Sequence, residues 1–165
     1  MSNRIFVCMQ EGMDAPEWLP KVEDFMTKVM KELGYDGEEV SIMFCGDEYI
    51  RELNKSYRNI DSATDVLSFE NDEVYEDEEG KWKCVGDIAI SLETLPVNAE
   101  YFDETKNNEL KRLLVHGLLH LNGMDHGEEH IEGGAEKKPE SAPECEMLKL
   151  QEKILEKLKD EKIII

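Results

Sequence analysis

The residues best suited to chemistry are three histidines in the segment 116–126, HGLLHLNGMDH. His116 and His120 are four residues apart, so on a helix their Cβ atoms lie roughly 5–6 Å from each other on one face. Gly123 can adopt the left-handed conformation that ends a helix, after which the chain can turn and present His126 from a third direction. Three neutral imidazoles bind a tetrahedral zinc and leave its fourth position open to water, as in catalytic zinc sites. The spacing therefore predicts a metal site held by His116, His120 and His126.

The alternative is that these histidines are ordinary core residues. The chain has four histidines, and three of them fall in this short and very apolar segment. A buried neutral imidazole destabilises a fold unless both of its nitrogens have partners, so three such rings without a ligand would be a poor way to build a core. The fourth, His130, lies in a polar segment and is interpreted as a solvated loop residue.

Gly117 limits the reactions that such a metal could serve. The spacing of the three histidines is that of the metzincin proteases, in which a Glu directly after the first His is the general base. Gly117 occupies that position here. A bound metal is therefore expected, and hydrolysis of peptide bonds is not.

Composition bounds the class of protein. A length of 165 residues suits one domain with a substantial core. With 19 basic and 39 acidic residues the net charge is −20, which argues against a general affinity for nucleic acid, although RNA could bind at one local basic surface. No apolar run approaches the roughly 18 residues of a membrane span, and the first residues do not resemble a signal peptide. We expect a cytoplasmic protein without membrane association, whose four cysteines are reduced thiols.

Hydrophobic periodicity predicts the elements that must position these residues. Strands are expected over 3–9, 38–45, 65–69 and 83–91. The first helix is expected to start at Pro16 and to end at Gly34, the second to cover 48–56 with Asp47 as its N-cap, and a short third helix to follow Thr94 as its N-cap. Two further helices are expected over 104–122 and 144–160. The acidic segment 71–81 and the segment 127–144 are expected to be flexible loops. This order predicts a fold of the α+β class, with a single domain over residues 1–165 and a mixed sheet of about four strands packed with helices. The three-histidine site is expected on a central helix and the turn that follows it.

Several carboxylates could assist the histidines. Asp87 follows Gly86 inside a predicted strand, where a glycine suggests a bulge or a close backbone approach. Asp87 could accept a hydrogen bond from a ligand histidine, or it could be an edge-strand charge. Asp65 and Asp125 are candidate general bases or supports of the ligands, although Asp125 could equally cap a local turn.

Arg58 ends a predicted helix beside a polar turn. Its guanidinium could bind phosphate, or it could simply complement the negative end of the helix dipole. The spacing alone favours the second interpretation.

Three separated blocks of this sequence, YRNIDSATDVLSF, VGDIAIS and VHGLLHLNGMDH, resemble the YbeY family of bacterial endoribonucleases. Their order and spacing match from about Leu53 to His126, and MLKLQEKIL (147–155) resembles the last helix of that family. Met124 stands where the family usually has Tyr, and the segment 127–144 looks longer than is typical.

The resemblance implies one zinc per chain, bound by His116, His120 and His126, with His116 and Arg58 as catalytic residues and Arg58 also binding substrate. It implies cleavage of single-stranded RNA, maturation of 16S ribosomal RNA near its 3′ end, and ribosome quality control, with ribosomal RNA and the ribosome as partners. The nucleophile could be water or the neighbouring 2′-OH. The alternative function is a non-catalytic, zinc-stabilised ribosome assembly factor.

Overall fold

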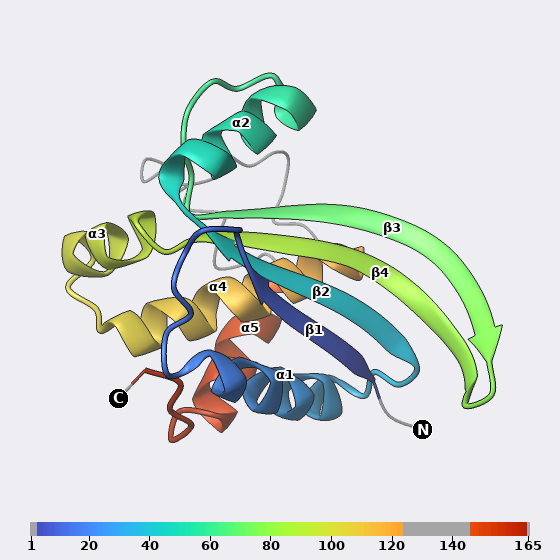
Figure 1. Cartoon of the computed structure of the whole chain (residues 1–165). Coiled ribbons are helices and arrows are strands. Elements are labelled where there is room, and N and C mark those ends of the chain that lie inside the picture. Colours follow the sequence, from blue (N-terminus) through green and yellow to red (C-terminus); the bar gives the residue numbers. More distant parts are fainter. Residues whose placement is uncertain (1–2, 124–145, 165) are drawn as a thin grey trace.

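The computed structural model of the chain describes residues 3–123 and 146–164, in which four strands and five helices form (Figure 1). In chain order they are β1 (Arg4–Met9), α1 (Leu19–Leu33), β2 (Glu38–Cys45), α2 (Asp47–Arg58), β3 (Val66–Asp77), β4 (Gly80–Ser91), α3 (Thr94–Tyr101), α4 (Lys106–Leu121) and α5 (Glu146–Lys157). The predicted order of elements and the single-domain α+β class are confirmed. None of the helices in the described ranges combines the length and apolar character that a transmembrane span requires.

The four strands form one mixed sheet in the order β1-β2-β4-β3. β1 and β4 both run parallel to β2, whereas β3 pairs antiparallel with β4. β4 is therefore an inner strand, and β3 is an edge strand of the sheet. Parallel pairing needs a crossover between strands, and α1 supplies it between β1 and β2.

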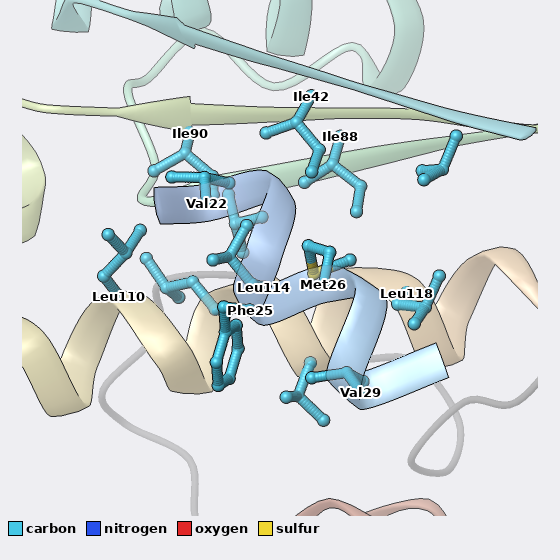
Figure 2. Close-up of a cluster of buried hydrophobic side chains, with 14 of the residues drawn as sticks. Val22, Phe25, Met26, Val29, Ile42, Ile88, Ile90, Leu110, Leu114 and Leu118 are labelled. Carbon is cyan, nitrogen blue, oxygen red and sulfur yellow. The ribbon is translucent and has the colours of Figure 1, made fainter. Parts of the chain in front are cut away.

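One face of the sheet is covered by α1 and α4, with α5 packed against these two helices, and the main core lies there (Figure 1). α1 buries residues at helical spacing against this face. Figure 2 shows how the two helices meet the sheet: Val22, Phe25, Met26 and Val29 come from α1, Ile42, Ile88 and Ile90 from the sheet, and Leu110, Leu114 and Leu118 from α4.

The opposite face is partly covered by α2, which packs a second and smaller cluster (Figure 1). Ile50 of α2 meets Cys45, Leu67 and Ala89 of the sheet, and Leu53 joins them. Side chains alternate between the two faces along a strand, so each residue of β3 and β4 belongs to either the α4 side or the α2 side.

The loop predicted over 71–81 is wrong, as is the short length given to the strand before it. β3 continues to Asp77, and only residues 78–79 connect it to β4. Arg4 of β1 stabilises this acidic hairpin, because its guanidinium lies 3.9 Å from the centroid of the Trp82 ring and 2.8 Å from Asp77. Arg4 is remote from this hairpin in the sequence, so the local run of acidic residues could not indicate that a cation would lie beside it.

The predicted start of the first helix is also wrong, whereas its end is confirmed. α1 begins at Leu19 rather than at Pro16, and Pro20 occupies its first turn. Gly34 ends the helix with φ +80°.

The N-caps predicted at Asp47 and Thr94 are wrong. Each of these residues is the first residue of its helix, and the N-cap positions are occupied by Gly46 and Glu93. The Asp47 carboxylate instead accepts hydrogen bonds from the hydroxyls of Ser91, at 2.6 Å, and of Thr94. The Asp47 side chain, which could have capped α2, is thus engaged in a tertiary contact that joins α2 to the end of β4.

The irregularity predicted at Gly86 is confirmed. The pairing of β3 with β4 shifts between Glu70 and Glu73, and Gly86 has φ +140°. A Cβ at Gly86 would lie 2.1 Å from the carbonyl oxygen of Phe69. Only glycine permits this approach of the two strands.

Candidate functional site

The first two predicted ligands lie on α4, a helix that the fold holds firmly. Thr105 caps its start by accepting a hydrogen bond of 3.0 Å from the backbone N–H of Asn108. Most residues from Leu110 to Leu121 are buried. Gly123 follows the helix with φ +88°, the left-handed conformation that its position predicts.

His116 and His120 lie side by side on α4, with ring centroids 4.9 Å apart. The Nδ1 atom of His116 is 2.9 Å from the Oε1 atom of Gln151 on α5. With Oε1 as the acceptor, Nδ1 carries the proton, and Nε2 is the ring nitrogen that would bind a metal. Gln151 is 3% exposed, so it holds this imidazole from a buried position.

Sequence reasoning missed Gln151, although a signal was present. Met147, Gln151 and Ile154 recur at helical spacing on α5, Leu158 follows directly after it, and Gln151 is the polar member of this otherwise apolar row. The buried Lys111 of α4 holds the segment that follows α5, because its Nζ donates hydrogen bonds of 2.8 Å to the carbonyl oxygens of residues 158 and 161.

The histidines continue a row of polar residues along α4. Arg112 lies one turn before His116, and its guanidinium forms a bidentate pair with the buried Glu109, with distances of 2.6 and 3.2 Å. Arg112 also lies 3.9 Å from the carboxylate of Asp65, which directly precedes β3. The row therefore runs along the flank of α4 that faces β3 and α5.

The structure places Asp65 at the start of this row, where its carboxylate is held by hydrogen bonds to neighbouring side chains. Its carboxylate accepts hydrogen bonds of 3.0 Å from Asn98 Nδ2 and 3.3 Å from Thr64 Oγ1. Burial raises the pKa of Asp65, and Arg112 opposes the rise. These contacts suit a residue that fixes the start of β3 against α3 and α4.

Two residues of β3 that were not among the predicted site residues face α4. Ser68 pairs with Ile88, which contacts Gly117, and Glu70 pairs with Gly86, which contacts Leu121. Cross-strand partners share a face, so Ser68 and Glu70 point to the α4 side of the edge strand. The alternation along 66–70 could have revealed them.

Asp87 points to the other side. It pairs with Ser41 of β2 and with Phe69 of β3, and it alternates with Ile88, which faces α4. The structure does not bring Asp87 to the α4 histidines. The alternative of an edge-strand charge is wrong, because β4 is an inner strand.

The packing around Gly117 leaves little room for the carboxylate that serves as the general base at this position in the proteases. A Cβ at this position would lie 3.1 Å from the side chain of Ile88, in tight contact with the sheet. A carboxylate at position 117 would be directed into the core.

Arg58 is the last residue of α2 and is partly buried. Asn59 follows it with φ +63°, so the chain leaves the helix at once. The turn after α2 is held by hydrogen bonds from Asn54 Nδ2 to the carbonyl oxygen of Ser62, at 2.9 Å, and from the N–H of Ile60 to the carbonyl oxygen of Asn54.

His126 and Asp125, together with the loop predicted over 127–144, lie outside the described residues. Within residues 3–123 and 146–164, no three His, Cys, Asp or Glu side chains gather as a metal site requires. The three-histidine site therefore stays a prediction. Two of its imidazoles share one helix face and a buried acceptor orients one of them, which fits the donor set that zinc prefers.

Comparisons with known proteins cover almost the whole chain. A family model described as Endoribonuclease YbeY matches residues 8–159. The Endoribonuclease YbeY of Treponema denticola is 45% identical over 164 residues, which cover 99% of this chain and 98% of that protein. The protein of the same name from Aquifex aeolicus is 38% identical over 136 residues, or 82% and 83% of the two chains. A solution structure of TM1509 from Thermotoga maritima, 27% identical, aligns with a TM-score of 0.54 over 94% of this chain and 92% of that one.

Proposed function

The chain belongs to the YbeY family, and on that premise we propose that it is a zinc-dependent endoribonuclease that cleaves single-stranded RNA. The observation that carries the proposal is the pair of neighbouring imidazoles on α4, one of them oriented by the buried Gln151. A ligating histidine commonly donates its second ring N–H to an oxygen of this kind. Such an arrangement suits metal binding better than core packing.

His116 and His120, with His126 as the third ligand, would hold the ion. A zinc ion bound there supplies a Lewis acid for a phosphoryl oxygen and activates water near neutral pH. Gln151 would accept a hydrogen bond from Nδ1 of His116, so that Nε2 would be the ligating nitrogen. Gly117 leaves no carboxylate next to the first ligand, which favours phosphodiester over peptide chemistry.

Arg58 would bind the scissile phosphate. Its guanidinium offers planar paired donors, and its charge would offset the negative charge that develops during cleavage. The nucleophile is water or the neighbouring 2′-OH. An RNA with a single 2′-deoxy group at the cleaved position separates the two, because it is cut only if water attacks.

In the cell, we place this activity in the cytoplasm, on the ribosome. The proposed roles are maturation of 16S ribosomal RNA near its 3′ end and ribosome quality control. The family to which the chain belongs supports both roles.

The test compares single-stranded RNA with the same RNA annealed to its complement, using wild type and three variants. We expect wild type to cut the single strand alone, and His116→Ala and Arg58→Ala to lose most of the activity. Lys28→Ala, which removes a cation from α1, should behave as wild type. Equal cleavage by wild type and Arg58→Ala would remove Arg58 from the mechanism.

A non-catalytic, zinc-stabilised assembly factor is the second candidate. It is favoured by the engagement of Asp65 with Asn98 and Thr64, which leaves that carboxylate poorly placed to act as a general base. Bound zinc and ribosome binding that survives Arg58→Ala, without RNA cleavage, would establish it.

A further inference from the structure

An aromatic pair lies at the edge strand of the sheet, on the side opposite the histidines. Tyr57 lies on the same face of α2 as Ile50 and Leu53, which pack on the sheet, yet it is 69% exposed. Its ring lies against that of Phe69 on β3, with centroids 5.1 Å apart and an angle of 60° between the planes. α2 thus carries an aromatic ring toward the sheet without burying it.

The fold fixes this ring before any ligand arrives. Phe69 supports it from β3 and packs on the small cluster beneath α2. The turn that follows Tyr57 is tied back to the helix by Asn54, and by an ion pair of 2.7 Å between Arg51 and Asp61. A supported aromatic ring loses little conformational entropy when a flat partner stacks on it.

The position of the pair relative to the histidines follows from β3. Ser68 and Phe69 are neighbours, so one faces the α4 side and the other the α2 side. β3 is the edge of the sheet, with no further strand beyond it in the described part of the chain. A ligand that crosses this edge could therefore contact the α4 flank and the Tyr57 ring at the same time.

Charge indicates what kind of ligand suits the ring. Lys55 and Arg58 lie within two residues of Tyr57 along the chain. The nearest carboxylates in the sequence are Glu52 and Asp61, of which Asp61 is paired with Arg51. On the sheet, Phe69 is the cross-strand partner of Asp87. An equally exposed aromatic residue, Tyr101 of α3, packs against Phe102 but is followed by Asp103 and Glu104. An exposed aromatic ring with cations next to it in the chain suits a polyanion with flat rings better than one followed by carboxylates does.

We propose that Tyr57, supported by Phe69, is a stacking platform for one unpaired base of the RNA substrate, while the backbone crosses the β3 edge toward the histidines. The inference rests on the proposed function and adds a base-binding subsite to it. Unpaired bases can splay out and stack on aromatic side chains, but bases inside an RNA helix cannot. The platform thereby gives a physical reason for preference for single strands.

The test measures the dissociation constant of a short, fluorescently labelled single-stranded RNA in the presence of chelator, by anisotropy. Tyr57→Ala should weaken binding about tenfold, as removal of one base–aromatic stack does. Tyr57→Phe keeps the ring and should bind within about twofold of wild type. Tyr101→Ala, which removes an equally exposed tyrosine, is the matched control and should bind as wild type.

The outcomes separate this inference from the proposed function. Unchanged binding by Tyr57→Ala, or equal weakening by Tyr57→Ala and Tyr101→Ala, would overturn the platform while RNA cleavage by wild type still stands. A wild-type protein that neither binds nor cleaves RNA would overturn the proposed function itself. Thermal unfolding of Tyr57→Ala should match wild type, because the lost side chain is mostly exposed.

Discussion

Replacement of Gln151 by leucine tests the most specific contact at the site. The change removes the acceptor that lies 2.9 Å from Nδ1 of His116, at a position that is 3% exposed. Water cannot easily replace the lost partner there, so the imidazole is no longer held in the orientation and tautomer that suit a metal. Loss of such an outer contact typically weakens metal binding about 10- to 100-fold. This corresponds to roughly 1.4–2.7 kcal/mol of binding free energy.

The assay is competition for zinc between the protein and a chromophoric chelator. Gln151→Leu should show the weaker zinc affinity while its unfolding free energy without metal stays within about 1–2 kcal/mol of wild type, since leucine fits the apolar row of α5. Gln151→Glu retains an acceptor and should bind zinc at least as tightly as wild type. Lys153→Leu places leucine on the exposed side of the same helix and should change nothing. Wild-type affinity in Gln151→Leu would refute the role of this contact.

Two further predictions concern the frame of the site. In a urea titration, Gly86→Ala should lower the unfolding free energy by about 3 kcal/mol or more, because the new Cβ would collide with the Phe69 carbonyl. Gly34→Ala is the control: Gly34 has φ +80° but open space around it, so the substitution should lower the unfolding free energy by only about 1 kcal/mol. Because burial raises the pKa of Asp65, the folded protein binds its proton more tightly than the unfolded chain, and wild type loses stability as pH rises through that pKa. Asp65→Asn cannot ionise and should gain stability relative to wild type as pH is raised from about 4 to 8; the opposite trend would mean that Arg112 outweighs burial.

The features that were predictable from sequence are those encoded locally. The spacing of His116 and His120 requires only a helix, and the structure supplies one over Lys106–Leu121. Gly34 and Gly123 adopt the left-handed conformation that their positions after apolar helices predict. The number of strands was predictable but their order was not, because β4 inserts between β2 and the strand that precedes it in sequence.

The features that escaped prediction depend on residues far apart in the chain. The acidic end of β3 is a strand because Arg4 reaches it from β1, across the sheet. Asp47 does not cap its own helix because Ser91 and Thr94 occupy its carboxylate. Gln151 meets His116 only after α5 has packed on α4.

The central claim is tested most directly by returning zinc in steps to chelator-stripped protein while zinc content and cleavage of single-stranded RNA are measured on the same samples. Cleavage should rise with bound zinc until one equivalent per chain and then stay constant, and His116→Ala should neither retain the metal nor recover activity. Full cleavage by the stripped protein, or stoichiometric zinc retained by His116→Ala, would contradict the account.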